Sequence, residues 1–368
     1  MPVSFIRRIT KKILMVLNIT LSILFLLSAW LVSLSNPIGW LTGFLGLIIP
    51  YLILLQLLFL LFWLIAKPSY AIISLIALLL GWKQLYVLVA VKSIQPFSQV
   101  KDTVSLRVAS WNLRGFNGLG KVAGRTPLLK KQIADAVLQY HPDIICLQEF
   151  NQSEKENHIA LFSAQYPYHY FAPDYQKRSG NYQSGCIIFS RWPLLATQRI
   201  PYPDAESLLY ADVVKGTDTI RVFNTHLCSF RFNQDDYDDL EKIGVVEEQG
   251  VEASRNIFRK MKVAFQKREQ QAILVKNTIA VAPYPVILCA DFNDVPNSFS
   301  YHQVTGAGLQ DAFIQAGAGL GRTYISLAPT LRIDYIMAGA QWRVKQFGLV
   351  DEGLSDHFLL LADLKLEK

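Results

Sequence analysis

The first quarter of the chain lacks acidic residues. Residues 1–92 contain no Asp or Glu, although the whole chain of 368 residues has 29. Three apolar runs fill this segment, and each is about as long as the 20 residues that a helix needs to cross a bilayer. A cleaved signal peptide would show one shorter run, and three buried helices of a soluble domain would rarely lack acidic residues altogether. The runs are Ile13–Leu34, Trp40–Ala66 and Tyr70–Val91.

The third run is interrupted, which leaves two topologies open. Lys83 would be costly in the middle of a membrane unless its amine reaches the interface, so this run either crosses the bilayer or only dips into it. Positive charge favours the cytoplasmic side. It lies before the first run and between the second and third, at Arg7, Arg8, Lys11, Lys12 and Lys67.

We therefore expect residues 1–92 to be a membrane anchor with two to three transmembrane helices. The anchor would contact the lipid bilayer through residues 13–91. With two spans the rest of the chain would be cytoplasmic, and with three it would be extracytoplasmic. We favour three spans, in an integral protein of the inner or plasma membrane whose second domain lies outside the cytoplasm.

Cysteine is scarce, and the spacing of the cysteines matches no disulfide or metal-binding motif. The chain has four cysteines, and none has the C-x-x-C spacing of a zinc or redox site. Cys146, Cys186 and Cys289 fall within apolar runs that are typical of strands. We expect buried free thiols, neither a disulfide framework nor a zinc site.

The second part of the chain has no excess of positive charge. The chain has 36 Lys and Arg against 29 Asp and Glu, and the seven basic residues of 1–92 account for the difference. Proteins that bind duplex nucleic acid usually carry a basic face that neutralises phosphates. The balance therefore gives no support to a nuclease. An acidic stretch from Asp235 to Glu252 is expected to be a solvated loop and helix start.

Residues 93–104 resemble a linker, and residues 105–368 alternate short strands with a few helices. Amphipathic helices are predicted at Pro127–Tyr140 and near Val251–Val281. Many short strands with few helices predict an α+β sandwich, with two sheets packed face to face and helices outside. Turns at Arg191-Trp192-Pro193 and Lys215-Gly216 predict antiparallel pairing of the strands that flank them. The predicted strands are Leu106–Trp111, Asp143–Leu147, Tyr168–Phe171, Gly185–Ser190, Ala196–Ile200, Leu208–Val214, Thr219–Asn224, Val286–Ala290, Leu331–Met337, Trp342–Phe347 and Phe358–Leu364.

Six short polar motifs occur at or near the ends of these strands. Each motif alone has an ordinary explanation, because Asp, Asn and His also cap helices and form turns. Together they would place Asp, Glu, Asn and His side chains around one pocket, as a metal-dependent site for phosphate chemistry requires. The motifs are Trp111-Asn112, Gln148-Glu149, Thr225-His226-Leu227, Asp291-Phe292-Asn293, Arg332-Ile333-Asp334-Tyr335 and Ser355-Asp356-His357.

The motifs allow a division of roles in phosphoester hydrolysis, which needs a hard cation, a base for water and help for the leaving oxygen. Glu149 suits a Mg²⁺ ligand, and Asn112 either binds a metal-bound water or holds Glu149. Asp356 would bind the metal directly or through water. Mn²⁺ could replace Mg²⁺.

The remaining polar residues suit the reacting groups. Asp291 suits the base, and Asn293 would orient the attacking water or a phosphate oxygen. His357 would contact the phosphate with Asp334 as its partner. His226 would donate to the phosphate or to the leaving group.

The order of the six motifs resembles the endonuclease/exonuclease/phosphatase superfamily from about Leu106 to Leu364. The resemblance implies a four-layer α/β/β/α sandwich and Mg²⁺-dependent hydrolysis, and it supports the roles given above. Within the family, His226 resembles the deoxyribonuclease, sphingomyelinase and 5-phosphatase branches, whereas abasic-site enzymes usually have tyrosine there. Secreted deoxyribonucleases carry a glutamate partner for this histidine at a position that aligns roughly with Ser184.

We therefore expect a membrane-anchored, metal-dependent hydrolase of phosphoester bonds, a phosphodiesterase or a phosphatase. A lipid or small phosphoester is favoured as the substrate. The alternative enzymatic hypothesis is a membrane-anchored nuclease that acts on nucleic acid. The alternative from another class is a catalytically silent domain that binds phosphorylated ligands.

Overall fold

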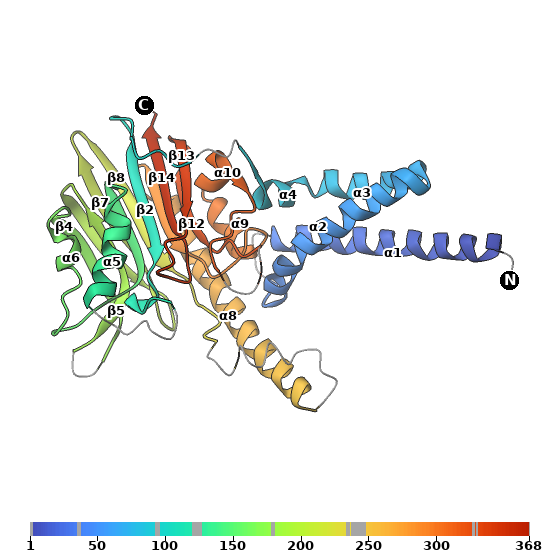
Figure 1. Cartoon of the computed structure of the whole chain (residues 1–368), viewed down its shortest axis with the longest axis horizontal. Helices are drawn as coiled ribbons and strands as arrows, with labels where there is room; N and C mark the ends of the chain where they lie inside the picture. Colours follow the sequence, from blue (N-terminus) through green and yellow to red (C-terminus); the bar gives the residue numbers. More distant parts are fainter. Residues whose placement is uncertain are drawn as a thin grey trace.

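A computed structural model describes most of the chain (Figure 1). Part of the glycine-rich loop Gly115–Gly124 and nearly all of the acidic stretch up to residue 247 lie outside the described residues. The structure describes residues 3–34, 38–92, 96–119, 127–177, 181–232, 236, 248–325, 328 and 330–367.

Two six-stranded sheets form the centre of the second domain. The strand orders are β13-β14-β2-β3-β5-β4 in the first sheet and β10-β12-β9-β8-β7-β6 in the second. Within these sheets only β2–β3 and β8–β9 are parallel neighbours. The first sheet consists of β2 (Leu106–Asn112), β3 (Ile144–Gln152), β4 (Tyr168–Gln176), β5 (Gln183–Ser190), β13 (Trp342–Val350) and β14 (Leu359–Leu366). The second consists of β6 (Leu194–Pro201), β7 (Ser207–Lys215), β8 (Asp218–His226), β9 (Val286–Asp291), β10 (Leu309–Asp311) and β12 (Asp334–Gly339).

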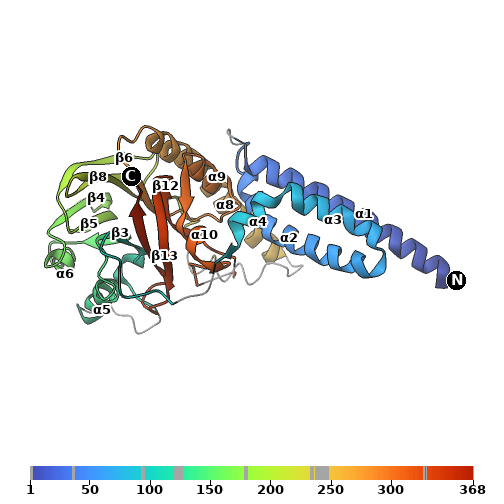
Figure 2. The same cartoon turned by 90° about the horizontal axis from the view of Figure 1, so that it is seen from above.

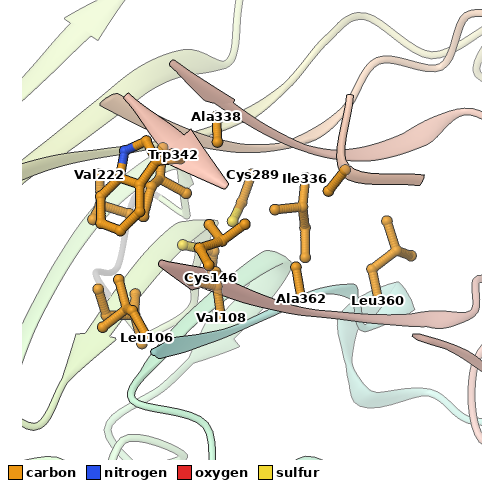
Figure 3. Close-up of a cluster of buried hydrophobic side chains, with 14 of the residues drawn as sticks. Leu106, Val108, Cys146, Val222, Cys289, Ile336, Ala338, Trp342, Leu360 and Ala362 are labelled. Atoms are coloured by element: carbon orange, nitrogen blue, oxygen red, sulfur yellow. The ribbon is translucent and has the colours of Figure 1, made fainter. Parts of the chain in front are cut away.

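Three apolar layers hold the sandwich together. The layer between the sheets includes Val108 and Cys146 from the first sheet and Val222 and Cys289 from the second (Figure 3). A second layer packs α5 (Pro127–Leu138) and α6 (Ala160–Ser163) on the first sheet. A third packs α8 (Glu248–Ala280) and α9 (Phe299–Thr305) on the second sheet. The four-layer α/β/β/α sandwich is therefore confirmed. Smaller elements are η1 (Arg114–Phe116), α10 (Ala312–Ala316), and the pair β1 (Ala90–Val91) with β11 (Ala318–Gly319).

One predicted strand pairing is wrong. The turn Arg191-Trp192-Pro193 does not join paired neighbours, because β5 pairs with β3 and β4, while β6 pairs with β7 in the other sheet. The chain crosses between the sheets at this turn, and Trp192 packs against the layer between them. The turn at Lys215-Gly216 does join an antiparallel pair, β7 and β8. All four cysteines are buried and free, as predicted.

The N-terminal helices form a bundle that projects from one side of the sandwich (Figures 1 and 2). They are α1 (Val3–Val32), α2 (Leu41–Ala66), α3 (Pro68–Leu80) and α4 (Trp82–Leu88). Among the described residues, Phe5–Val32 and Leu41–Ala66 are long and apolar enough to cross a membrane. α3 and α4 together would make a third span, but they are bent by 64° at Gly81. The interruption expected in the third run is this bend.

The bundle is bound closely to the sandwich. Gly43 and Gly46 of α2 allow the contact, since a Cβ atom on Gly43 would lie 2.1 Å from the Phe265 ring and one on Gly46 would lie 3.0 Å from the Cα of Ser298. Near the C-terminal end of the anchor sequence, in α4, Gln84 also contacts the sandwich: Asn297 donates hydrogen bonds to its carbonyl and side-chain oxygens (both 2.9 Å). The first turns of α2 are thus packed as part of the sandwich.

The segment expected to be a linker is partly bound to the sandwich. Residues 93–95 lie outside the described residues. Beyond them, Arg107 donates hydrogen bonds to the carbonyls of Ser98 (2.9 Å) and Gln99 (3.0 Å), and its guanidinium lies over the Phe97 ring. Phe97 also approaches Gly348 of β13.

Candidate active site

The predicted site residues come from both sheets and meet at one end of the sandwich. Asn112 ends β2 beside Gln148 of the parallel strand β3, and His226 ends β8 beside Asp291 at the end of the parallel strand β9. Asp334 begins β12, which runs antiparallel to β9, so it too is paired with Asp291. His357 lies two residues before the start of β14, the antiparallel neighbour of β2. This topology brings the ends of distant segments together.

Asp291 is the most completely held residue of the site. Its side chain is fully buried. One oxygen accepts from the backbone N–H of Asn293 (2.8 Å), and the other accepts from the amide of Asn112 (2.8 Å). Asn293 has a positive φ of 51°, and its amide nitrogen lies 2.9 Å from Nε2 of His226. Asp291 is therefore fixed between two donors, with His226 Nε2 3.6 Å from its carboxylate.

His357 and Asp334 form a buried pair. Nδ1 of His357 lies 3.0 Å from each carboxylate oxygen of Asp334 and 3.8 Å from Oδ2 of Asp291. Burial lowers the pKa of His357, but the neighbouring charges of Asp334 and Asp291 outweigh it and raise that pKa to about 10. Burial also raises the pKa of Asp334, to about 6, against the opposing effect of His357. The two carboxylates thus favour the protonated form of His357, whose Nε2 lies 4.0 Å from Asp356.

His226 is a second imidazole with a preference for the charged form. Burial lowers the pKa of His226, whereas the charges of Asp291 and then Glu149 raise it, and the net direction is upward. Its Nε2 lies 3.9 Å from Oε1 of Glu149. In this arrangement the Asn293 amide donates to Nε2 of His226 as well as to the Leu227 carbonyl.

Glu149 and Asp356 are the two acidic side chains among the described residues that line the cavity beside the site. Glu149 sits at a bulge of β3 with φ 50°, which turns its side chain toward Asn112. The Asn112 amide donates to Glu149 (3.1 Å), while its oxygen accepts the backbone N–H of Arg114 (2.9 Å). The Asn112 side chain thus hydrogen-bonds both Glu149 and Asp291.

The donor set fits a hard cation. Burial raises the pKa of Asp356, His357 and Arg114 lower it, and the like charge of Glu149 raises it further. Two carboxylates that repel each other beside a cavity form a set of oxygen ligands of the type that Mg²⁺ takes in proteins.

A second group of ligand atoms lies deeper in the site. Oxygens of Asp291 and Asp334 and a nitrogen of His357 lie within 4.8 Å of one another. Nδ1 of His357 faces the Asp334 carboxylate, so these three side chains form a hydrogen-bonded cluster whose atoms are also close enough to share a metal ion.

The site opens into a cavity of about 390 Å³. Polar side chains line part of it, namely Arg114, Glu149, Asn293, Asp356 and His357. They come from three of the six predicted motifs and from η1. Apolar side chains line the rest, including side chains of α2 in the N-terminal bundle.

Sequence reasoning missed several residues that build the site. Arg114 lies 3.3 Å from Asp356 and lines the cavity, but the sequence signal around it is only that of a glycine-rich loop. Asn224 joins the two sheets beneath the site, since it accepts from Gln148 (2.8 Å) and donates to the carbonyls of Leu147 and Ile187. Buried Arg268 of α8 donates to the carbonyl of Asn293. The sequence gives one indication of the role of Asn224, which is its position as a polar residue in an otherwise apolar strand.

Comparison with known proteins identifies the family. The chain belongs to the endonuclease/exonuclease/phosphatase family, whose sequence model matches residues 109–357. A domain of unknown function matches residues 11–88. No curated protein sequence matches the chain.

Solved structures share the fold at low sequence identity. An endonuclease/exonuclease/phosphatase from Beutenbergia cavernae is 20% identical with a TM-score of 0.52, and the match covers 72% of each chain. One from Bacteroides vulgatus is 19% identical with a TM-score of 0.50, covering 72% of this chain and 99% of that one. A family protein from Bacteroides thetaiotaomicron has the same identity and TM-score, with 72% and 96% covered. These likenesses establish the fold of the second domain.

Proposed function

We propose that this protein is a membrane-anchored, Mg²⁺-dependent hydrolase of phosphoester bonds, with a lipid or small phosphoester as substrate. The observation that carries the proposal is the arrangement around Asp291, a buried carboxylate held by Asn112 and Asn293 between two imidazoles of raised pKa. Such an arrangement suits a base that takes a proton from water while cationic groups receive negative charge nearby.

Each side chain has a part in this proposal. Asp291 accepts the proton of the attacking water, and the Asn293 amide orients that water or a phosphate oxygen. The protonated His357 donates through Nε2 to a phosphate oxygen, and Asp334 keeps it charged and oriented. His226 donates to the phosphate or to the leaving oxygen. Glu149 and Asp356 would hold Mg²⁺, or Mn²⁺ in its place, which supplies positive charge to the phosphate when bound.

The shape of the anchor supports an extracytoplasmic catalytic domain. Lys11 and Lys67 both approach the ring of Tyr70, at 5.6 and 4.2 Å, so the basic residues of α1 and of the α2–α3 turn lie at one end of the bundle. The sandwich lies at the other end (Figure 1). Because basic residues favour the cytoplasmic side, the sandwich belongs on the opposite side, in an inner or plasma membrane.

Turnover by the purified full chain tests the proposed function. In detergent with Mg²⁺, we expect hydrolysis of one class among phospholipid, inositol phosphate and DNA substrates. Asp291→Asn keeps the size of the side chain and removes the base, so it should reduce kcat by about 10²–10⁴-fold. Undiminished turnover in Asp291→Asn would contradict the role of Asp291. Binding of a phosphorylated ligand without any turnover, with either Mg²⁺ or Mn²⁺, would instead indicate a binding domain.

A further inference from the structure

The apolar end of the active-site cavity is built partly from the membrane anchor. Leu47, Pro50 and Tyr51 of α2 line the same cavity as Glu149 and His357. Positions 47, 50 and 51 lie on one face of a helix, since they are three and four residues apart. The site of hydrolysis is thus continuous with the surface of a helix that is apolar enough to cross a membrane.

The catalytic domain completes this apolar end. Phe230 and Phe232, from the segment that follows β8, are stacked with their ring centroids 5.2 Å apart. Met261 of α8 lies on the same cavity wall. Aromatic and methionine side chains facing an open cavity favour a flexible hydrocarbon ligand over a charged or strongly hydrated one.

The depth of α2 places this cavity at the edge of the hydrocarbon layer. α2 has 26 residues, which is about 39 Å of helix, whereas the hydrocarbon core of a bilayer is about 30 Å thick. Lys67 follows the helix and would stay in the interface on the far side. A hydrocarbon core of this thickness takes up about 20 residues of helix. Counted toward the N-terminus from Ala66, these residues end near Leu47, where the helix leaves the hydrocarbon. The apolar end of the cavity therefore meets lipid tails, and the polar end lies above them.

The polar end complements a phosphate group. Arg114 lies beside Asp356 with about half of its side chain exposed, and Arg231 reaches the cavity from the segment that contains Phe230. Arginine guanidinium groups bind phosphate oxygens well. The cavity thus offers cationic and metal-binding groups at one end and hydrocarbon contacts at the other, as the two halves of a phospholipid require.

We propose that the substrate is a membrane lipid phosphoester whose hydrocarbon chain lies between α2 and the Phe230–Phe232 segment while its phosphate reaches Asp291. This inference rests on the proposed phosphoester hydrolase activity and names the substrate class of the same site. In the proposed topology the lipid comes from the leaflet next to the catalytic domain. α2 then acts as one wall of the substrate site as well as an anchor.

Two synthetic substrates with one reacting centre test the proposal. Methyl and dodecyl esters of p-nitrophenyl phosphate differ only in hydrocarbon, and the full chain can be assayed on both in phosphatidylcholine nanodiscs with Mg²⁺. We expect kcat/KM for the dodecyl ester to exceed that for the methyl ester by about tenfold or more, which burial of only about two methylene groups would supply. Leu47→Trp fills the apolar end and should lower kcat/KM for the dodecyl ester toward that for the methyl ester, so that the preference is lost.

Ile48→Trp is the matched control, because Ile48 is the next residue of α2 but does not line the cavity. It should keep the wild-type preference. The lipid site would be overturned if Leu47→Trp and Ile48→Trp preferred the dodecyl ester equally, or if the wild type had no preference for it. Either result would leave the proposed hydrolase activity intact. If Asp291→Asn hydrolysed each ester as fast as the wild type does, the proposed function itself would be overturned.

Photolabelling tests the lipid site without turnover, and it therefore applies even if the enzyme hydrolyses neither ester. Phosphatidylcholine vesicles with about 10 mol% of a lipid that carries a diazirine at the acyl-chain end can be photolysed with the full chain. We expect labelling of the peptides that contain Phe230–Phe232 and Met261 in the wild type and in Ile48→Trp, and its loss in Leu47→Trp. Labelling that is absent from these peptides, or equal in both Trp variants, would contradict a hydrocarbon chain in the cavity.

Discussion

At the scale of single residues, the charge on His357 depends on one buried partner. Asp334 is the side chain that faces Nδ1 at 3.0 Å, and it is the largest source of the raised pKa of His357. An uncharged partner would still fill the space but would no longer stabilise the imidazolium. The pair is therefore a sensitive point for catalysis, even though Asp334 does not itself line the cavity.

Asp334→Asn should reduce kcat by about 10²–10⁴-fold with a much smaller change in KM, because the cationic donor to the phosphate is lost. Steady-state kinetics of the full chain with Mg²⁺ measures this. Asp212→Asn is the matched control, since Asp212 is equally buried and pairs with Arg221 at 2.7 Å away from the site. The control should lower stability without lowering kcat. Equal loss of kcat in both variants would mean that Asp334 acts only on folding.

At the scale of secondary-structure elements, the site could be predicted because its residues belong to local patterns. Several of the predicted strands end at a polar motif, and parallel neighbours such as β8 and β9 bring their ends to one edge of a sheet. His226 and Asp291 could be expected to meet for this reason. The bulge that turns Glu149 toward Asn112 left no sequence signal, because a bulge is set by the pairing of β3 with β5.

Contacts between distant elements could not be predicted. The strands β5 and β6 follow each other closely, and a short turn favours pairing of neighbours, yet the chain changes sheet between them. The role of α2 as a wall of the cavity was also hidden, because its apolar residues suit a membrane span equally well. The glycines at positions 43 and 46 depart from the large apolar residues of that helix, and their reason lies in the close approach of Phe265 of α8 and of Ser298.

The contact between α2 and α8 contains a buried acid that makes it sensitive to pH. Glu269 accepts a hydrogen bond from the Thr42 hydroxyl, and burial raises the pKa of Glu269 to about 7 despite this bond. A carboxyl whose pKa is higher in the folded state binds more protons there, so stability falls as the pH rises from about 4.5 to 7. We expect a loss of up to about 3 kcal/mol over this range.

Glu269→Gln should remove this part of the pH dependence, because the amide keeps a hydrogen-bond acceptor without a charge. Thermal unfolding of the full chain in nanodiscs between pH 5 and 8 measures it. The variant should match the wild type at pH 5 and have the higher Tm at pH 8. Glu252→Gln, at an exposed position of the same helix, should follow the wild type throughout. Parallel Tm curves for wild type and Glu269→Gln would contradict a charge-sensitive contact.

At the scale of the whole molecule, the number of membrane crossings decides which lipids the site can reach. Leu34, which follows α1, lies at the sandwich, where its carbonyl accepts from Gln303 of α9 (2.7 Å). α4 returns to the same side, where Arg332 donates to the carbonyl of Val87 (2.5 Å). The described part of the anchor therefore joins the sandwich after α1 and again at α4, whereas Lys11 and Lys67 lie at the opposite end of the bundle. An odd number of crossings is the arrangement that fits these contacts, because α1 starts at the basic end and α4 finishes at the sandwich.

Labelling of introduced cysteines tests this topology against a low background, since the four native thiols are buried. Val100→Cys lies on the exposed surface of the catalytic domain, and Phe5→Cys lies near the start of α1. In intact cells, or in spheroplasts where an outer membrane intervenes, a membrane-impermeant maleimide should label Val100→Cys but label Phe5→Cys only after permeabilisation. Labelling of both variants only after permeabilisation would place the N-terminus and the site together in the cytoplasm. In that case α3 and α4 dip into the membrane without crossing it, and the cavity beside α2 would take its lipid from the inner leaflet.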